Sequence, residues 1–228
     1  DGTPDRLIGT IRTAETTNVA VPGQSLEIGS PTFAIEAADL DGDGIDEIVI
    51  ATEAGKLRIY QPTASGGIAG PFDYVIGSIP VDIASGDYDG DGTIDLAIAN
   101  FGDDDLSILL NPDEDPGDLV AAENLVVPAG PASIATVDLG EAEGNLVAGG
   151  ADLFVVSRAT GTATGYKSRG GGTFEKVSEV EVVLDGGRIL VWRKGAWGVY
   201  DPDIFREFFA GKLHKRSVDS LVGSVYAL

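Results

Sequence analysis

The stretch Asp39-Leu-Asp-Gly-Asp-Gly-Ile-Asp-Glu-Ile-Val-Ile-Ala51 decides the fold, because a close copy of it follows 48 residues later. The copy reads Asp87-Tyr-Asp-Gly-Asp-Gly-Thr-Ile-Asp-Leu-Ala-Ile-Ala99. The likeness extends outward to the runs on either side of each loop: Phe33–Ala38 and Val81–Gly86 before, Lys56–Tyr60 and Asp105–Leu110 after. Self-similarity at a fixed spacing indicates a repeat architecture.

Two weaker copies follow. The third consists of Ala132–Gly140, Asn145–Gly149 and Asp152–Val156, and the fourth of Val177–Leu184, Arg188–Trp192 and Ala196–Tyr200. Each copy has three short β-rich runs broken by Gly or Asp, and a fourth run links successive copies: Phe72–Ile76, Glu123–Val127 and Phe174–Val177. Four strands in about 50 residues are typical of a propeller blade. We therefore predict an all-β fold, a β-propeller of about four four-stranded blades.

The runs Ile48–Ala51 and Leu96–Ala99 are wholly apolar, as expected of strands buried between neighbouring sheets. A β-sandwich is the alternative, but the equal phase of the two loops favours the propeller. We expect Ser25–Ser30 to complete the fourth blade. The predicted organisation is an N-terminal extension (1–24), the propeller (25–200), and a C-terminal extension (201–228) with a short helix and a final strand.

Acidic residues occupy positions 1, 3, 5 and 9 of each loop: Asp39, Asp41, Asp43 and Glu47 in the first, Asp87, Asp89, Asp91 and Asp95 in the second. Such crowded carboxylates repel one another unless a hard cation lies between them, and Ca²⁺ takes about 6–8 oxygen ligands. Position 7, Ile45 or Thr93, is expected to contribute a main-chain carbonyl. An EF-hand is excluded because its twelfth position requires Glu, whereas Ile50 and Ile98 stand there. We predict two Ca²⁺ sites.

Residues Asp39–Ala51 and Asp87–Asn100 resemble the FG-GAP/VCBS repeat of integrin α-subunit propellers and secreted microbial proteins. Gly70–Phe72 and Gly171–Phe174 are similar to its Gly-x-Phe feature, and the resemblance covers roughly residues 25–200. It implies that the eight acidic residues hold Ca²⁺ within the blades. The third loop, Asp138–Asn145, lacks acids at positions 3 and 5, so Glu141 and Glu143 are not assigned a metal.

The net charge of -22 argues against a nucleic-acid partner, which requires a basic face. Residues 1–150 carry 4 basic and 28 acidic side chains, and the rest carry 11 and 9. No run reaches the ~18 apolar residues of a membrane span. With no Cys and a single His, His214, no nucleophilic or zinc site is indicated. A glycosidase would use paired carboxylates, but these acids are assigned to metal, so we expect no enzyme.

The absence of Cys and Met fits a secreted or cell-surface protein, with Asp1 as a processed N-terminus. The leading hypothesis is a structural or assembly subunit of an extracellular filament or surface layer, which self-associates through terminal strands. The strand Leu7–Ala14 either adds to the sheet edge of a neighbour or pairs with its own fourth blade. The second hypothesis is an adhesin or lectin-like module that recognises glycan or protein through its face loops.

Overall fold

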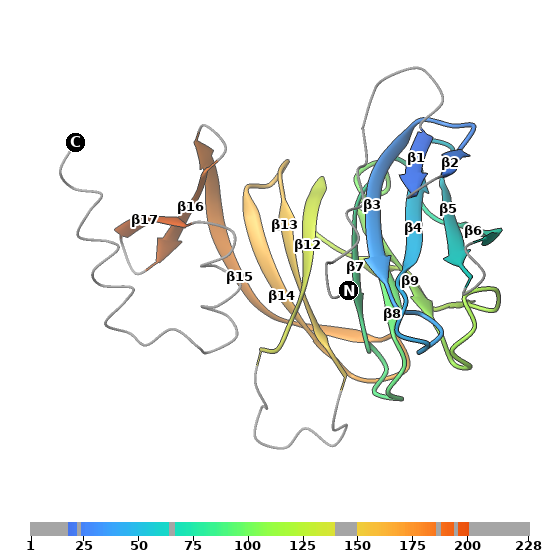
Figure 1. Cartoon of the computed structure of the whole chain (residues 1–228). Coiled ribbons are helices and arrows are strands. Elements are labelled where there is room, and N and C mark those ends of the chain that lie inside the picture. Colours follow the sequence, from blue (N-terminus) through green and yellow to red (C-terminus); the bar gives the residue numbers. More distant parts are fainter. Residues whose placement is uncertain are drawn as a thin grey trace, which may run out of the picture.

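The computed structural model describes residues 18–21, 24–63, 67–139, 150–185, 188–193 and 196–200 (Figure 1). Throughout these ranges the secondary structure is β-strand, with no helix. No membrane-spanning helix is therefore found in the described ranges. The predicted terminal strands Leu7–Ala14 and Ser224–Leu228 and the predicted helix Asp203–Gly211 lie outside them.

The first two repeat copies form the first two sheets. One sheet has the antiparallel order β3 (Thr32–Ala38), β4 (Glu47–Thr52), β5 (Lys56–Pro62), β6 (Ile68–Val75). The next joins β7 (Pro80–Gly86), β8 (Asp95–Asn100) and β9 (Asp105–Leu110), and two short strands, β10 (Val120–Ala121) and β11 (Leu125–Val126), both pair with β9. The predicted runs are therefore confirmed as antiparallel sheets. The second linking run, predicted at Glu123–Val127, contains β11, and β10 is an additional strand that precedes it.

The third and fourth copies share one sheet, of order β12 (Pro131–Val137), β13 (Asp152–Ser157), β14 (Thr162–Ser168), β15 (Phe174–Asp185), β16 (Arg188–Arg193), β17 (Ala196–Tyr200). The first part of β15 pairs with β14, and its last four residues pair with β16. The prediction of two separate runs within 174–184 is wrong, because no Gly or Pro interrupts this stretch. In the described ranges, the fourth copy extends the third sheet and does not form a four-stranded blade of its own.

A two-stranded hairpin precedes the first sheet, formed by β1 (Asn18–Val21) and β2 (Gln24–Glu27). The expectation that Ser25–Ser30 completes the fourth blade is wrong: the strand in this stretch, β2, pairs with β1. Only two residues separate the two strands, so closing this local hairpin loses little chain entropy. The following residue, Ile28, is buried against the outer face of the first sheet, and the Arg58 guanidinium donates to its carbonyl. The hairpin spans the predicted domain boundary at residue 24.

The central strands β4 and β8 are buried along their whole length, as predicted. Leu96 and Ile98 of β8 pack toward the first sheet, whereas Ala97 and Ala99 pack toward the third. Successive side chains of a strand point to opposite faces, so a strand between two neighbours must be apolar at every position. The first strands of the three sheets, β3, β7 and β12, lie side by side, and both acidic loops lie at the same end of their sheets (Figure 1).

Candidate metal centre

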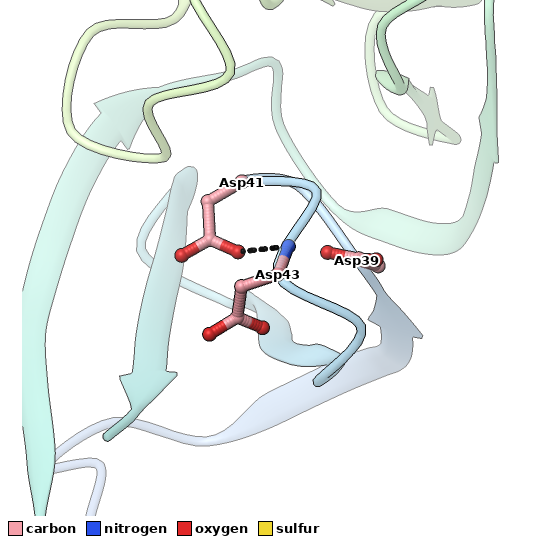
Figure 2. A group of neighbouring side chains, drawn as sticks. All are labelled: Asp39, Asp41 and Asp43. Carbon is pink, nitrogen blue, oxygen red and sulfur yellow. Dashed lines mark hydrogen bonds between the residues drawn. The ribbon is translucent and has the colours of Figure 1, made fainter. Parts of the chain in front are cut away.

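The first acidic loop joins β3 to β4 and gathers three carboxylates. One oxygen each from Asp39, Asp41 and Asp43 lies within 4.8 Å of the others (Figure 2). Main-chain N–H groups of the loop orient them: Gly44 donates to Asp39 (3.0 Å), Asp43 to Asp41 (3.1 Å) and Ile45 to Asp43 (2.8 Å). These bonds fold the loop around its own side chains, so that one oxygen of each carboxylate converges on the same place.

The glycines of the loops are required by backbone geometry. At positions 4 and 6 the φ angles are 71° and 86° in Gly42 and Gly44, and 85° and 97° in Gly90 and Gly92. This left-handed region is strained for residues with a Cβ. All four glycines have positive φ, which accounts for the similar turn of the two loops.

One oxygen of the first loop has no partner within the described part of the chain. Asp39 Oδ1 is buried, and no hydrogen-bond donor reaches it there. A buried carboxylate oxygen without a donor or cation is costly. A cation among Asp39, Asp41 and Asp43 would satisfy it and would also offset the mutual repulsion of the three charges. The donor set is all oxygen, which suits a hard cation such as Ca²⁺. The residues present therefore fit a divalent cation.

The second loop gathers a different set. Here Asp87, Asp89 and Asp95 each place one oxygen within 4.8 Å of the others. Asp91 lies outside this group, and its Oδ1 accepts from both the N–H and the hydroxyl of Thr93, which lowers its pKa. The structure thus brings together positions 1, 3 and 5 in the first loop and 1, 3 and 9 in the second. The predicted carbonyl contributions of Ile45 and Thr93 stay predictions, as do the ligand roles of Glu47 and Asp91.

The acids at position 9 close the loops from inside. Glu47 Oε2 accepts from the N–H of Leu40 (2.7 Å), and Asp95 Oδ2 accepts from the N–H of Tyr88 (2.7 Å). Both acids are almost fully buried. In the third copy Asp152, also buried, accepts from Leu139 in the same way (2.8 Å). The acid that begins the second strand of each sheet therefore has a structural role in all three copies, including the third, whose loop lacks acids at positions 3 and 5.

The two buried acids differ in the number of main-chain N–H groups that stabilise the charged carboxylate. Burial raises the pKa of Glu47 to about 7, with the Leu40 N–H opposing it and the loop aspartates adding to it. Burial also raises the pKa of Asp95, to about 6, but two N–H groups oppose it, those of Asn111 and Tyr88. By strand register, Pro62 stands in the first sheet where Asn111 stands in the second. Proline has no N–H to donate, so Glu47 lacks this second donor.

Sequence reasoning missed Gln61 and Asn111. The Gln61 amide donates to the second carboxylate oxygen of Asp41 (2.5 Å). Both residues stand at the end of the third strand of a sheet, where an apolar run gives way to a polar residue. A polar residue at the end of such a run is the sequence feature that could have identified them. Glu141 and Glu143 of the third loop lie outside the described residues.

The comparisons with known proteins agree with this geometry. Residues 39–98, which include both acidic loops, match the model of the FG-GAP-like repeat. The resemblance drawn from the first two copies is therefore confirmed. A comparison with curated protein sequences gives no significant match.

Several solved structures share the fold. BBS1N in complex with ARL6DN, soaked with lead, is 16% identical with a TM-score of 0.51, covering 87% of this chain and 66% of that one. A functionally unknown protein from Desulfotomaculum acetoxidans is 14% identical with a TM-score of 0.56, covering 82% and 64%. A protein from Lactobacillus plantarum is 13% identical with a TM-score of 0.55, covering 87% and 68%.

This chain thus spans slightly less than two thirds of the length of the first two of these chains. These structural neighbours are β-propeller-like proteins. At such low identities the likeness extends to the fold alone. The chain is an all-β protein with sheets of the propeller type, and it carries an FG-GAP-like repeat at its candidate metal sites.

Proposed function

We propose that this chain is a non-catalytic, calcium-binding β-propeller that acts outside the cell as a structural or assembly subunit of a filament or surface layer. The observation that carries the metal-binding part is the convergence of carboxylates in two homologous loops, with a buried oxygen of Asp39 that has no donor in the described part of the chain. The carboxylates of Asp39, Asp41, Asp43 and Glu47 would hold one ion, with the Ile45 carbonyl. Those of Asp87, Asp89, Asp91 and Asp95 would hold the other, with the Thr93 carbonyl.

Single substitutions test which loops bind. Asp41→Ala and Asp89→Ala are each expected to remove one ion per chain, because each deletes a carboxylate from one gathered group. Glu141→Ala is the matched control in the third loop and is expected to remove none. Elemental analysis of the three purified variants, after dialysis against Ca²⁺, measures the count. An ion lost from the Glu141 variant would show that the loops are wrongly aligned.

The assembly part rests on sheet edges and charge. The eight-residue strand β6 pairs, within the described ranges, with β5 alone, and its last residue, Val75, is 84% exposed. An unpaired strand edge is a template for a strand of another chain. The run Leu7–Ala14, in which apolar and β-branched residues predominate, has the composition of such a strand. The excess of acidic residues in 1–150 and the basic stretch Lys212–Arg216 supply complementary charge for head-to-tail contact.

Truncation tests this part. Deleting residues 1–17 keeps the β1–β2 hairpin and is expected to give a folded, calcium-binding monomer, because the donated strand is lost. Size-exclusion chromatography and negative-stain microscopy compare the truncated chain with the full chain. Raised salt should weaken assembly of the full chain by screening its charges. Unchanged oligomers after truncation would refute donation of the strand, and a chain that fails to fold would place the strand within its own subunit.

A second candidate function is a binding module for a protein or glycan. A polar cavity of about 420 Å³ lies between β3, β7 and β12, lined by residues that include Glu36, Asp82, Ser133 and Thr136. The structural neighbour BBS1N was solved in complex with ARL6DN. A full-length chain that stays a monodisperse monomer and binds immobilised glycan or protein would favour this role over assembly.

A further inference from the structure

One buried residue touches both acidic loops. Asn111 follows β9 and is 1% exposed. Its main-chain N–H donates to Asp95 Oδ1 of the second loop (2.9 Å). Its side-chain amide donates to the carbonyl of Leu40 in the first loop (2.7 Å) and to the carbonyl of Ile94 (3.2 Å), and its Oδ1 accepts from the N–H of Asp115 (3.0 Å). Hydrogen bonds to both the nitrogen and the oxygen of its amide therefore fix the Asn111 side chain.

The same link recurs between the second and third copies. Ser168 follows Tyr166 by two residues, as Asn111 follows Leu109, and Tyr166 and Leu109 occupy equivalent register positions. Ser168 donates its N–H to Asp152 (3.0 Å) and its hydroxyl to the carbonyl of Tyr88 (2.7 Å). Each of these residues thus binds the buried acid of its own sheet and the position-2 carbonyl of the preceding loop. The same pair of hydrogen bonds therefore connects each sheet to the preceding loop as a repeated feature of the fold.

The segment after Asn111 also lies against the first sheet. A Cβ built on Gly42 would meet the carboxylate of Glu114 at 3.3 Å, so this side chain lies beside the first loop. The Tyr74 hydroxyl donates to the Pro116 carbonyl (2.8 Å) and accepts from the Leu119 N–H (3.1 Å). Residues 111–119 therefore run from the end of the second sheet across to the first. A displacement of this segment would change its contacts with both loops.

We propose that the two acidic loops are energetically coupled through Asn111, so that a cation bound in one loop raises the affinity of the other. This inference rests on the proposed calcium binding. A cation that fixes Asp39 and Asp41 also fixes the intervening Leu40 peptide, whose carbonyl the Asn111 amide holds. The same Asn111 orients Asp95, a member of the second group. Asn111 is a positioning residue and not a ligand.

Calorimetry of single-site variants measures the coupling. Asp41→Ala leaves only the second site, and its Kd is expected to be weaker than that of the second site in the unaltered chain by about fivefold or more. Coupling between two binding sites is reciprocal, so Asp89→Ala should weaken the first site by the same factor. With Asn111→Ala added, loss of one site should leave the other unaffected. Asn111→Ser, which copies Ser168, should restore part of the coupling.

Asn124→Ala is the matched control, because the Asn124 amide bonds Asp105, away from both loops. It should leave the coupling intact. A second measurement needs no change at Asn111: in the Asp41→Ala chain, Ca²⁺ that fills only the second loop should slow hydrogen exchange of the Leu40 N–H in the first.

Two results would overturn the coupling: a second-site Kd unchanged by Asp41→Ala together with unchanged Leu40 exchange, or coupling of undiminished size in Asn111→Ala. Both leave calcium binding itself standing. If the unaltered chain binds no ion, the proposed function fails and the coupling with it.

Discussion

Saturating Ca²⁺ is expected to raise the melting temperature of the metal-free chain by roughly 10–20 °C. At 100 times its Kd, a ligand that binds only the folded state adds about 2.7 kcal/mol per site, and a chain of this size gains about 2–4 °C for each kcal/mol. Nine acidic side chains crowd the two loops, and one carboxylate oxygen, Asp39 Oδ1, is buried with no donor among the described residues. In the metal-free state the carboxylates repel one another and the buried oxygen lacks a partner. A bound cation removes both costs.

Differential scanning calorimetry of protein shown by elemental analysis to be metal-free checks this expectation. Mg²⁺ at the same concentration is the control for ionic strength, and it should stabilise less because it loses water reluctantly and demands stricter geometry. A melting curve that is identical with Ca²⁺ and with excess chelator would remove the basis for the metal assignment.

Ile98→Ala is expected to lower the free energy of unfolding by about 2–5 kcal/mol. Ile98 is fully buried in β8 and packs into the cluster between the first two sheets. Its side chain is enclosed between its own sheet and the first sheet, so the surroundings cannot readily close around the missing atoms, and the loss of apolar contact is joined by the cost of a cavity.

Val75→Ala is the matched control for this substitution. Val75 ends the edge strand β6 and is 84% exposed, so its truncation should change stability by less than about 0.5 kcal/mol. Urea denaturation of both variants at constant Ca²⁺ gives the comparison. Equal losses from the two variants would contradict the assignment of β8 as a strand enclosed between two sheets.

Much of the fold follows from local pattern. The runs of β4 and β8 are apolar at successive positions, which does not suit a strand with one solvent-exposed face. The loop glycines require positive φ. Both features are set by a few neighbouring residues, so they could be predicted from the sequence. The family match to residues 39–98 falls where this pattern is strongest.

The failed predictions depend on long-range partners. Whether β2 completes a distant blade or pairs with β1 depends on chain connectivity, and its own composition does not distinguish the two. Likewise β15 joins two repeat copies because nothing interrupts its extended run, although a repeat alignment places a boundary there. Asn111 was missed because its partner Leu40 is 71 residues away, and a single polar residue at a strand end gives no sign of what it contacts.

The number of Ca²⁺ ions that the unaltered chain binds is the most direct test of the two proposed sites. Equilibrium dialysis followed by elemental analysis is expected to give two ions per chain, and none in a chain carrying both Asp41→Ala and Asp89→Ala. No bound ion in the unaltered chain, or two ions retained by the doubly substituted chain, would contradict the central claim that these two loops are the calcium sites.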